Sequence, residues 1–404
     1  MRSPGCHAGA PLCLRNLYAG DLLMPHRTPR AAFGTAVVRV LKPQESHMAK
    51  EHAMRIAQVA PLYEAVPPSG YGGTERIVSY LTEELVRQGH EVTLFATADS
   101  RTAARLVPVT PRGLRLDASC KDPIARHLFM LEEVSRQVDA FDVIHFHTGY
   151  LHFPLVRRQH FPNLTTLHGR LDYPEFVALH QEYGEIPVAT ISDSQRVPVR
   201  GIAWEGTVYH GLPGALYRQG PGDGGYLAFV GRFSPEKGAH EAVQIARRAG
   251  MPLRIAAKVE PIDQEYFDTV ARPLLDDPLV EWVGELSDAQ KQDFLGRAAA
   301  LVFPIRWPEP FGLVMIEAMA CGTPVIAYGH GSVPEVIEHG RSGFIVDGPE
   351  QAARAIACLD RFDRSGCRAA FEERFTASRM ANDYVRIYAD LAARHASEPL
   401  ARAI

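Results

Sequence analysis

Long hydrophobic runs are missing from this sequence of 404 residues. No uninterrupted apolar stretch approaches the roughly 18 to 20 residues that a membrane-spanning helix needs. The N-terminal region also lacks an apolar core followed by a small-residue cleavage site, the pattern of a secretory signal. We therefore expect a cytoplasmic protein that is soluble or at most peripheral to a membrane.

Paired cysteines and an excess of basic charge are missing as well. The six cysteines are scattered without a C-x-x-C pair, which favours free thiols in a reducing compartment. The formal net charge of -4 argues against a nucleic-acid partner, because neutralising a phosphate backbone requires a basic surface. Any site for an anion must be local.

Charge is unevenly distributed along the chain. Residues 1–53 hold seven Lys or Arg and three acids, whereas residues 54–404 hold 36 basic and 44 acidic residues. We expect this Arg-rich and Pro-rich segment to be a disordered or mis-assigned extension, with a targeting leader or a functional tail as alternatives. Met48 and Met54 are then candidate start positions.

The remaining sequence alternates short apolar runs with helical patterns, which indicates an α/β fold with doubly wound parallel sheets. The hydrophobic fraction of the whole chain, 46%, is that of a folded globular protein. The pattern runs twice, interrupted by a Gly- and Pro-rich stretch at residues 211–225. We predict Rossmann-like domains at residues 54–212 and 213–375, facing a central cleft. Residues 376–404 are predicted to form a helix that packs back on the first domain.

The predicted strands and helices divide between these two regions. In the first, strands are expected at residues 55–60, 91–96, 141–147, 164–167 and 188–191, and helices at 75–88 and around 129–138. In the second, strands are expected at 226–230, 253–257, 280–283, 300–303, 324–327 and 343–346, and helices at 239–249, 286–299 and 313–320.

Two loops between a strand and a helix carry features of an anion site. Gly72 and Gly73 directly precede a predicted helix, so their backbone N–H groups and the helix N-terminus can face a phosphate. Arg232 and Lys237 lie in a similar loop and can bind a diphosphate through a guanidinium fork and a point charge. Taken alone, each loop could equally be a turn with solvated charges.

A third loop is the most specific. Glu309 stands just before a predicted helix that contains Glu317, and Phe311, Gly312 and Leu313 lie at its start. A carboxylate at the mouth can accept hydrogen bonds from sugar hydroxyls, while the free N–H groups of the first turn face a phosphate. The alternative interpretation is a capping acid and a surface glutamate.

Together these motifs resemble those of retaining glycosyltransferases of family 4, which have the GT-B fold. The resemblance rests on Y-G-G-T-E-R from Tyr71, D-V-I-H-F-H from Asp142 and T-L-H-G from Thr166, with I-S-D-S from Ile191 and V-Y-H-G from Val208. It also rests on the Arg232 loop, the two glutamates and G-S-V-P-E from Gly331. It spans residues 54–388.

The resemblance implies a nucleotide-sugar donor and a role for each matching residue. Arg232 and Lys237 would contact the donor diphosphate, Glu309 the sugar hydroxyls and Glu317 the ribose, with His168 near the transferring sugar. A UDP-sugar is the preferred donor. Position 210, often Asn in this family, is His here.

The histidines of the first half leave three interpretations open. His145 and His147 end one predicted strand on the same face, and they could belong to a metal site, a hydrogen-bonded network or a ligand contact. Together with Ser192 and His210 they are further candidates for the cleft. No Asp-x-Asp occurs in the chain, and acidic ligands are what a diphosphate-bridging metal prefers. We therefore expect no metal and no cofactor.

The predicted function is transfer of a hexose from a nucleotide diphosphate sugar to a hydroxyl acceptor, such as a glycan, a lipid-linked sugar or a small metabolite, by a monomer or weak homodimer. Glu309, His168, Arg232 and Lys237 are the predicted catalytic residues. Fold alone does not decide function, so an epimerase or phosphorylase of the same architecture and a non-catalytic sugar-binding protein remain alternatives.

Overall fold

The computed structural model describes residues 53–70 and 72–397. The predicted N-terminal extension lies outside these residues, apart from its last position. No helix in the described ranges has the length and apolar character needed to cross a bilayer.

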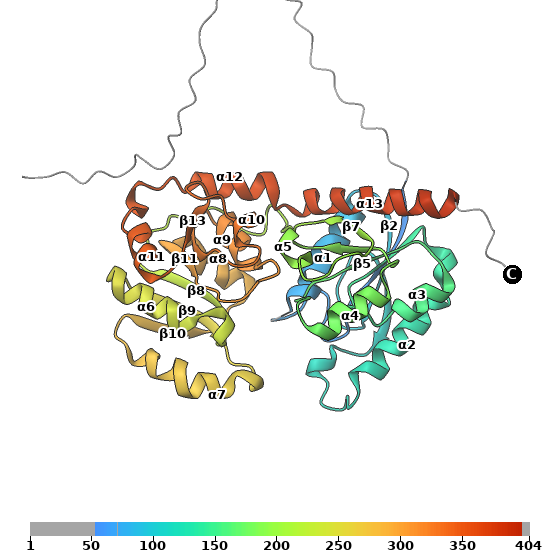
Figure 1. The fold of residues 1–404 in the computed structure, drawn as a ribbon, viewed down its shortest axis with the longest axis horizontal. Helices are drawn as coiled ribbons and strands as arrows, with labels where there is room; N and C mark the ends of the chain where they lie inside the picture. The colour runs from blue at the N-terminus through green and yellow to red at the C-terminus, as the bar shows by residue number, and fades with distance from the viewer. Residues whose placement is uncertain (1–52, 71, 398–404) are drawn as a thin grey trace, which may run out of the picture. The chain divides into compact units, whose positions relative to one another are not determined.

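Seven parallel strands form the first sheet, in the order β3-β2-β1-β4-β5-β6-β7 (Figure 1). The strands are β1 (Arg55–Val59), β2 (Glu91–Thr97), β3 (Arg105–Thr110), β4 (Val143–Phe146), β5 (Asn163–Thr166), β6 (Val188–Thr190) and β7 (Trp204–Thr207). The helices between them are α1 (Gly73–Arg87), α2 (Pro123–Ser135), α3 (Phe153–Gln159), α4 (Pro174–Glu182) and α5 (Asp193–Arg196).

Six parallel strands form the second sheet, in the order β10-β9-β8-β11-β12-β13. The strands are β8 (Leu227–Arg232), β9 (Leu253–Lys258), β10 (Val280–Gly284), β11 (Ala300–Phe303), β12 (Val325–Tyr328) and β13 (Gly343–Val346). The helices are α6 (Ala239–Ala249), α7 (Gln264–Tyr266), α8 (Asp288–Arg297), α9 (Leu313–Ala320), α10 (Val333–Val336), α11 (Pro349–Ile356) and α12 (Ser365–Arg374).

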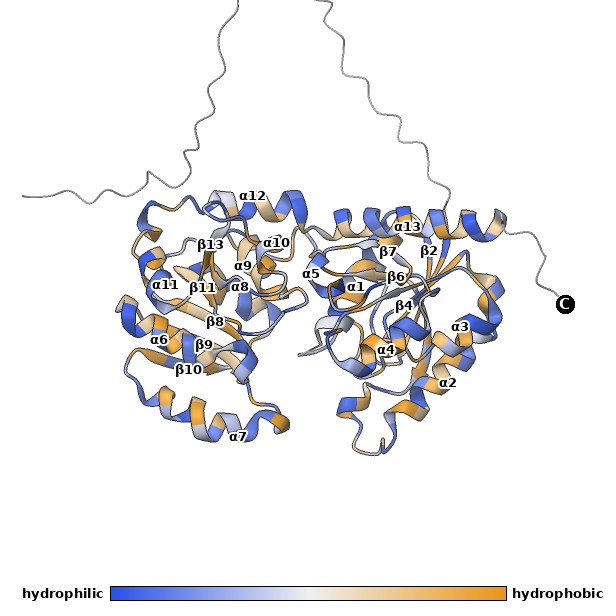
Figure 2. Cartoon of the chain, in the orientation of Figure 1, coloured by the Kyte–Doolittle hydropathy of each residue, from blue (hydrophilic) through white to orange (hydrophobic). Residues whose placement is uncertain are grey.

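Both sheets are covered on each face, as buried parallel strands require. Separate apolar clusters flank each sheet. Figure 2 shows the same division, with apolar strands and helices whose surfaces alternate between polar and apolar residues. The α/β architecture of doubly wound parallel sheets expected from the sequence is therefore confirmed.

The last helix, α13 (Ala377–Ser397), belongs in sequence to the second half but packs against α1, β4 and β5 of the first. Its buried residues Tyr384 and Tyr388 join Ile56 and Val143 in one cluster. The chain crosses over where Leu212 and Thr376 form a bridge. The helix therefore completes the core of the first sheet.

Gly211 lies at this crossover, and a Cβ atom there would stand 2.2 Å from the carbonyl oxygen of Thr376. We expect Gly211→Ala to lower the free energy of unfolding by about 3 kcal/mol or more, because backbone on both sides must move. Urea denaturation would measure this loss. Gly214→Ala is the matched control, since nothing lies within 4 Å of its added Cβ; equal losses in both variants would contradict the explanation.

The strand order places the candidate loops. In each sheet the order reverses between two central neighbours, β1 and β4 in the first and β8 and β11 in the second. The loops after these strands run in opposite directions and leave a crevice, which is where open parallel sheets bind ligands. The Gly72, His147, Arg232 and Glu309 loops follow these four strands.

Some element boundaries differ from the sequence-based expectation. Helix α2 begins at Pro123 rather than near Phe129, because the Asp122 side chain caps it by accepting from the N–H groups of Ile124 and Ala125. Leu128 and Phe129 are apolar but exposed, so the sequence pattern placed the apolar face and the start of the helix wrongly. Strands β3 and β7 and helices α3, α4, α5, α7, α10, α11 and α12 were not predicted.

Candidate active site

A cavity of about 770 Å³ is lined by loops that follow strands of both sheets. Most of the sequence-predicted site residues line it: Gly72, Gly73, His147, His168, His210, Arg232, Lys237, Glu309, Phe311, Gly312, Leu313 and Glu317. These residues come from loops up to 245 positions apart in the sequence, and the fold places them around one space.

Helix α1 starts at the wall of this cavity. Gly72 is its N-cap residue, with a φ of 154° that side chains rarely adopt. Gly73 follows as the first helical residue, and a Cβ built on it would lie 3.7 Å from Leu313 of α9. The first residues of helices α1 and α9 therefore lie close together at the cavity.

The predicted diphosphate-binding residues approach the predicted sugar-binding carboxylate. Lys237 Nζ forms an ion pair with Glu309 Oε2, which also accepts a hydrogen bond of 3.0 Å from the indole of Trp307. Arg232 lies on the same wall and pairs with Asp263 at 3.3 Å. Because Lys237 and Glu309 are mostly buried, their charges act in a medium of low dielectric, where electrostatic interactions are strong.

The loop that carries Glu309 is held by the G-S-V-P-E motif. The N–H of Ser332 donates to the carbonyl oxygen of Glu309 at 2.9 Å, and its hydroxyl donates to that of Phe311 at 2.8 Å. Gly331 has a φ of 57°, and its added Cβ would stand 2.3 Å from the Glu309 nitrogen. The motif therefore positions Glu309 by backbone contact.

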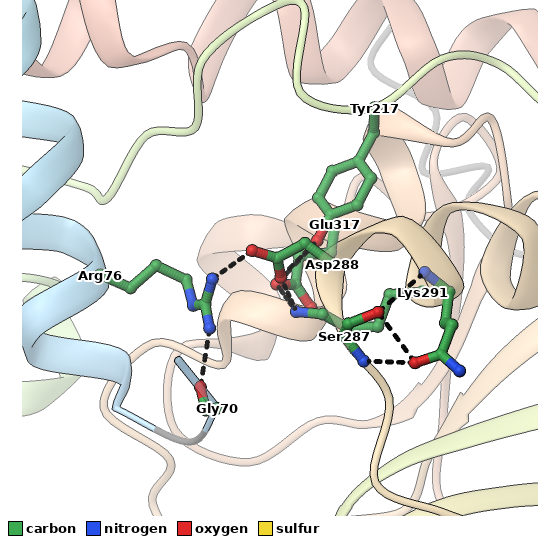
Figure 3. A network of polar contacts seen from close by, with 8 residues as sticks. Gly70, Arg76, Tyr217, Ser287, Asp288, Lys291 and Glu317 are labelled. Carbon is green, nitrogen blue, oxygen red and sulfur yellow. Dashed lines mark hydrogen bonds and ion pairs between the residues drawn. The ribbon is translucent and has the colours of Figure 1, made fainter. Parts of the chain in front are cut away.

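Glu317 lies on α9 at the end of a polar network that the sequence did not reveal (Figure 3). Its Oε1 accepts from Lys291 Nζ at 2.5 Å and from the hydroxyl of Tyr217 at 3.4 Å. Lys291 also pairs with Asp288 at 3.2 Å, and Asp288 forms an ion pair with Arg76. Arg76 was visible in the Y-G-G-T-E-R motif, but its partner depends on tertiary structure.

The histidines form a hydrogen-bonded network, part of which reaches the cavity. His147 forms a hydrogen bond of 2.9 Å from Nδ1 to His168 Nε2 and one of 2.8 Å from Nε2 to Gln58 Oε1. His145 does not line the cavity, contrary to the expectation, because its ring points into the core and bonds Tyr388 at 2.6 Å and Thr166 at 2.7 Å. Burial lowers the pKa of His168 to about 3 and that of His147 well below its usual value.

His210 lines the cavity beside His168, with the two rings stacked at 5.3 Å. It also meets Phe311 edge-on at 4.9 Å. Burial holds the pKa of His210 well below its usual value, so this departure from the family pattern adds a neutral aromatic ring at neutral pH.

Ser192 is a second correction, because it is fully buried and does not line the cavity. Its hydroxyl caps α5 by accepting from the N–H of Gln195. The N–H groups of Asp193 and Ser194 donate to the carboxylate of Glu335, each at 2.7 Å. The I-S-D-S and G-S-V-P-E motifs therefore meet in a contact between the two halves.

The buried histidines predict loss of stability in acid. His145, His147, His152, His168 and His210 all have a folded-state pKa below the usual value, whereas in the unfolded chain they bind protons near pH 6.5. Stability should therefore fall by several kcal/mol from pH 7 to pH 5 and stay flat above pH 7 with respect to these groups.

Urea denaturation across this pH range measures the slope. His152→Gln should reduce it by roughly one proton, since His152 is buried against Thr165 and Phe146, while a substitution of exposed His395 should not change it. A stability independent of pH between 5 and 7 would contradict the prediction.

In residues 53–70 and 72–397, no group of three or more His, Cys, Asp or Glu side chains is arranged to hold a metal ion. The histidines considered for such a site instead bond to one another and to Gln58, Thr165, Thr166 and Tyr388.

Two family models match the chain, one for each half. Residues 71–192 match the model described as Glycosyltransferase Family 4, and residues 219–362 match that described as Glycosyl transferases group 1. The chain is a family 4 glycosyltransferase. It is thus a transferase enzyme, and the two models cover the residues that line the cavity apart from Pro61, Tyr63, Gly70 and His210.

Named relatives and solved structures agree with this assignment. The glycosyltransferase is 28% identical to the glycogen synthase of Mycobacterium tuberculosis, with 72% of this chain and 81% of the relative covered. It resembles AviGT4, a glycosyltransferase involved in avilamycin A biosynthesis, with 25% identity, a TM-score of 0.65 and coverage of 84% and 98%. The fold also matches Anabaena HepE in complex with UDP-glucose, with 19% identity, a TM-score of 0.62 and coverage of 85% and 100%.

Proposed function

We propose that this glycosyltransferase moves a hexose from a UDP-sugar to a hydroxyl group of a glycan, a lipid-linked sugar or a small metabolite. We further propose that the anomeric configuration is retained and that no metal ion takes part. The observation that carries the proposal is the arrangement of Arg232, Lys237 and Glu309 on one wall of the cavity, with Glu317 on the helix that follows.

The donor would lie along that wall. Arg232, Lys237 and the N–H groups of Gly72, Gly73, Gly312 and Leu313 would face the diphosphate, Glu309 the sugar hydroxyls and Glu317 the ribose. Only one oxygen of Glu317 is used by Lys291 and Tyr217, which leaves Oε2 to accept from a ribose hydroxyl. UDP-glucose is the first donor to test, because HepE is described in complex with it.

Transfer requires cleavage of the bond between the anomeric carbon and the phosphate oxygen. The electron pair leaves with UDP, and the transition state gains positive charge on the sugar and negative charge on the diphosphate. Arg232, Lys237 and the helix N-termini are placed to stabilise that negative charge. His168, neutral because of its lowered pKa, adds no positive charge beside the sugar.

Retention follows if the acceptor attacks from the face that UDP leaves. The acceptor oxygen bonds to the anomeric carbon, and its proton passes to an oxygen of the departing diphosphate, so that charge and atoms balance. A double displacement would instead need a carboxylate nucleophile at the anomeric carbon, and Glu309, the carboxylate proposed to face the sugar, is held in an ion pair with Lys237.

The acceptor would enter from the side of the first sheet. There the cavity is lined by Tyr63, Tyr150 and Ile124, three partly exposed side chains. Aromatic rings of this kind offer flat apolar faces with a polar tip, which suits a sugar ring or an apolar carrier.

Thermal shift with a panel of nucleotide sugars tests the proposal, because a ligand that binds only the folded state raises Tm by mass action. UDP-glucose and UDP should each raise Tm, with no change on addition of EDTA. Product analysis by NMR should show the donor's anomeric configuration. Absence of any shift with UDP compounds, or a shift abolished by EDTA, would refute the donor class or the metal independence, respectively.

A further inference from the structure

Arg76 connects the two halves of the molecule at the cavity. It is the fourth residue of α1, in the first half, and its guanidinium forms an ion pair with Asp288, the first residue of α8 in the second half. A second N–H group donates to the carbonyl oxygen of Gly70 at 2.8 Å. Figure 3 shows Arg76 reaching from α1 toward Asp288 and Lys291.

Four charges alternate along this contact. Arg76 is followed by Asp288, Lys291 and Glu317, with 12%, 31%, 12% and 6% of the respective side chains exposed. The Lys291 ammonium stands between two carboxylates, at 2.5 Å from Glu317 and 3.2 Å from Asp288. The positive charge of Lys291 is therefore divided between Asp288 and Glu317. How strongly Lys291 interacts with one carboxylate depends on whether another cation neutralises the other carboxylate.

Arg76 determines how the charge of Lys291 is divided between Asp288 and Glu317. With its guanidinium on Asp288, the Asp288 charge is compensated and Lys291 is available to Glu317. Without it, Asp288 would be left with Lys291 as its cation, and Lys291 would be drawn away from Glu317. An uncompensated carboxylate in a partly buried site is costly, so this redistribution is favoured.

We propose that Arg76 is a positioning residue, which acts through Asp288 and Lys291 to orient Glu317 for a vicinal diol. The ligand class is the ribose of a nucleotide, whose hydroxyls donate to the carboxylate. This inference rests on the proposed donor function, and it adds a condition that the donor half cannot meet alone. The second half cannot complete the diol site by itself, because Arg76 comes from the first half.

Equilibrium binding of UDP and of its 2′-deoxy analogue to the full chain tests the idea without any turnover. In the wild type, UDP should bind about tenfold tighter, as expected for one hydrogen bond to a charged group. Arg76→Gln should reduce this preference to about twofold or less, whereas Asp288→Asn should keep it, because no second carboxylate then competes with Glu317 for Lys291. Arg76→Lys, which keeps the charge, should restore part of it.

The double variant Arg76→Gln/Asp288→Asn adds a second measurement. Because Asp288→Asn removes the charge that could draw Lys291 away from Glu317, the double variant should recover the UDP to deoxy-UDP ratio that Arg76→Gln alone loses. Arg170→Gln is the matched control: Arg170 forms another ion pair between the halves, with Glu236 at 3.1 Å, but belongs to no contact of Glu317. Its ratio should remain that of the wild type.

The outcomes separate this inference from the proposed donor. If the wild type prefers UDP and Arg76→Gln keeps that preference, or the double variant fails to restore it, the positioning role is refuted while the donor class stands. An equal loss in Arg170→Gln would also refute it, since any weakened contact between the halves would then suffice. ADP and GDP are tested in the same way, each with its 2′-deoxy analogue. If the wild type binds none of UDP, ADP and GDP, both proposals fail.

Discussion

Lys237→Met is expected to lower kcat/KM for glycosyl transfer by a factor of about 10³, because removing one pre-positioned donor to a developing negative charge costs this much in other enzymes. Lys237 is the cation paired with Glu309 at the cavity wall, so its loss would affect both the diphosphate and the predicted sugar contact. Initial rates with UDP-glucose as donor measure the effect.

Two further variants separate chemistry from stability. Lys237→Met leaves the Glu309 carboxylate without its cation, so Tm should fall; the double variant Lys237→Met/Glu309→Gln should recover Tm but not activity. Lys258→Met is the control, since Lys258 lines the same cavity and pairs with Glu260 instead. Its rate should fall less than tenfold. A Lys237→Met enzyme with a tenth of wild-type activity or more would overturn the assignment.

Gly331→Ala should reduce transfer by about 100-fold through the backbone alone. The added Cβ would lie 2.3 Å from the nitrogen and 2.4 Å from the oxygen of Glu309, distances at which the Glu309 loop must move. A displacement of about 1 Å at a reacting group can cost this much in rate. The substitution also places a side chain at a φ of 57°, which costs about 1 to 2 kcal/mol of stability.

Gly340→Ala isolates the two effects. Gly340 has a φ of 83°, but nothing lies within 4 Å of its added Cβ. Gly340→Ala should therefore lose stability from backbone strain alone, Gly331→Ala should lose more because its Cβ also clashes with the Glu309 backbone, and only Gly331→Ala should lose activity beyond a few fold. Equal kcat/KM values in the two variants would show that the G-S-V-P-E motif does not position Glu309.

Much of the fold follows from local sequence patterns. Runs such as residues 343–346 and the amphipathic pattern of residues 239–249 were predicted with the bounds that β13 and α6 have, because buried parallel strands and amphipathic helices leave distinct periodicities. The missed strand β3 contains Pro108 and lies at the edge of the sheet, where most of its residues are only partly buried, so its composition resembles a loop.

The candidate site was predictable to the extent that its residues stand in motifs. Arg232, Lys237, Glu309 and Glu317 were recognised because they occupy loops and a helix after strands, where open sheets bind ligands. Asp288 and Lys291 were not, since their neighbours in sequence carry no signal of chemistry. Their role arises from Glu317 and Arg76, which are distant in the chain.

By itself, the sequence determined that this chain forms two doubly wound α/β units and that it carries the motifs of a family 4 glycosyltransferase. The mildly acidic net charge argued against a nucleic-acid partner, and the lack of long apolar runs argued against a membrane-spanning helix. Any anion site therefore had to be local. Tertiary structure decided which motif residues share the cavity: His147 does, but His145 two positions earlier bonds to Tyr388 in the core. The physical reason is that the alternation of residues along a strand determines on which face of the sheet a side chain lies, whereas the burial of that side chain depends on which element packs over that face. Here that element is α13, which returns from the far end of the chain.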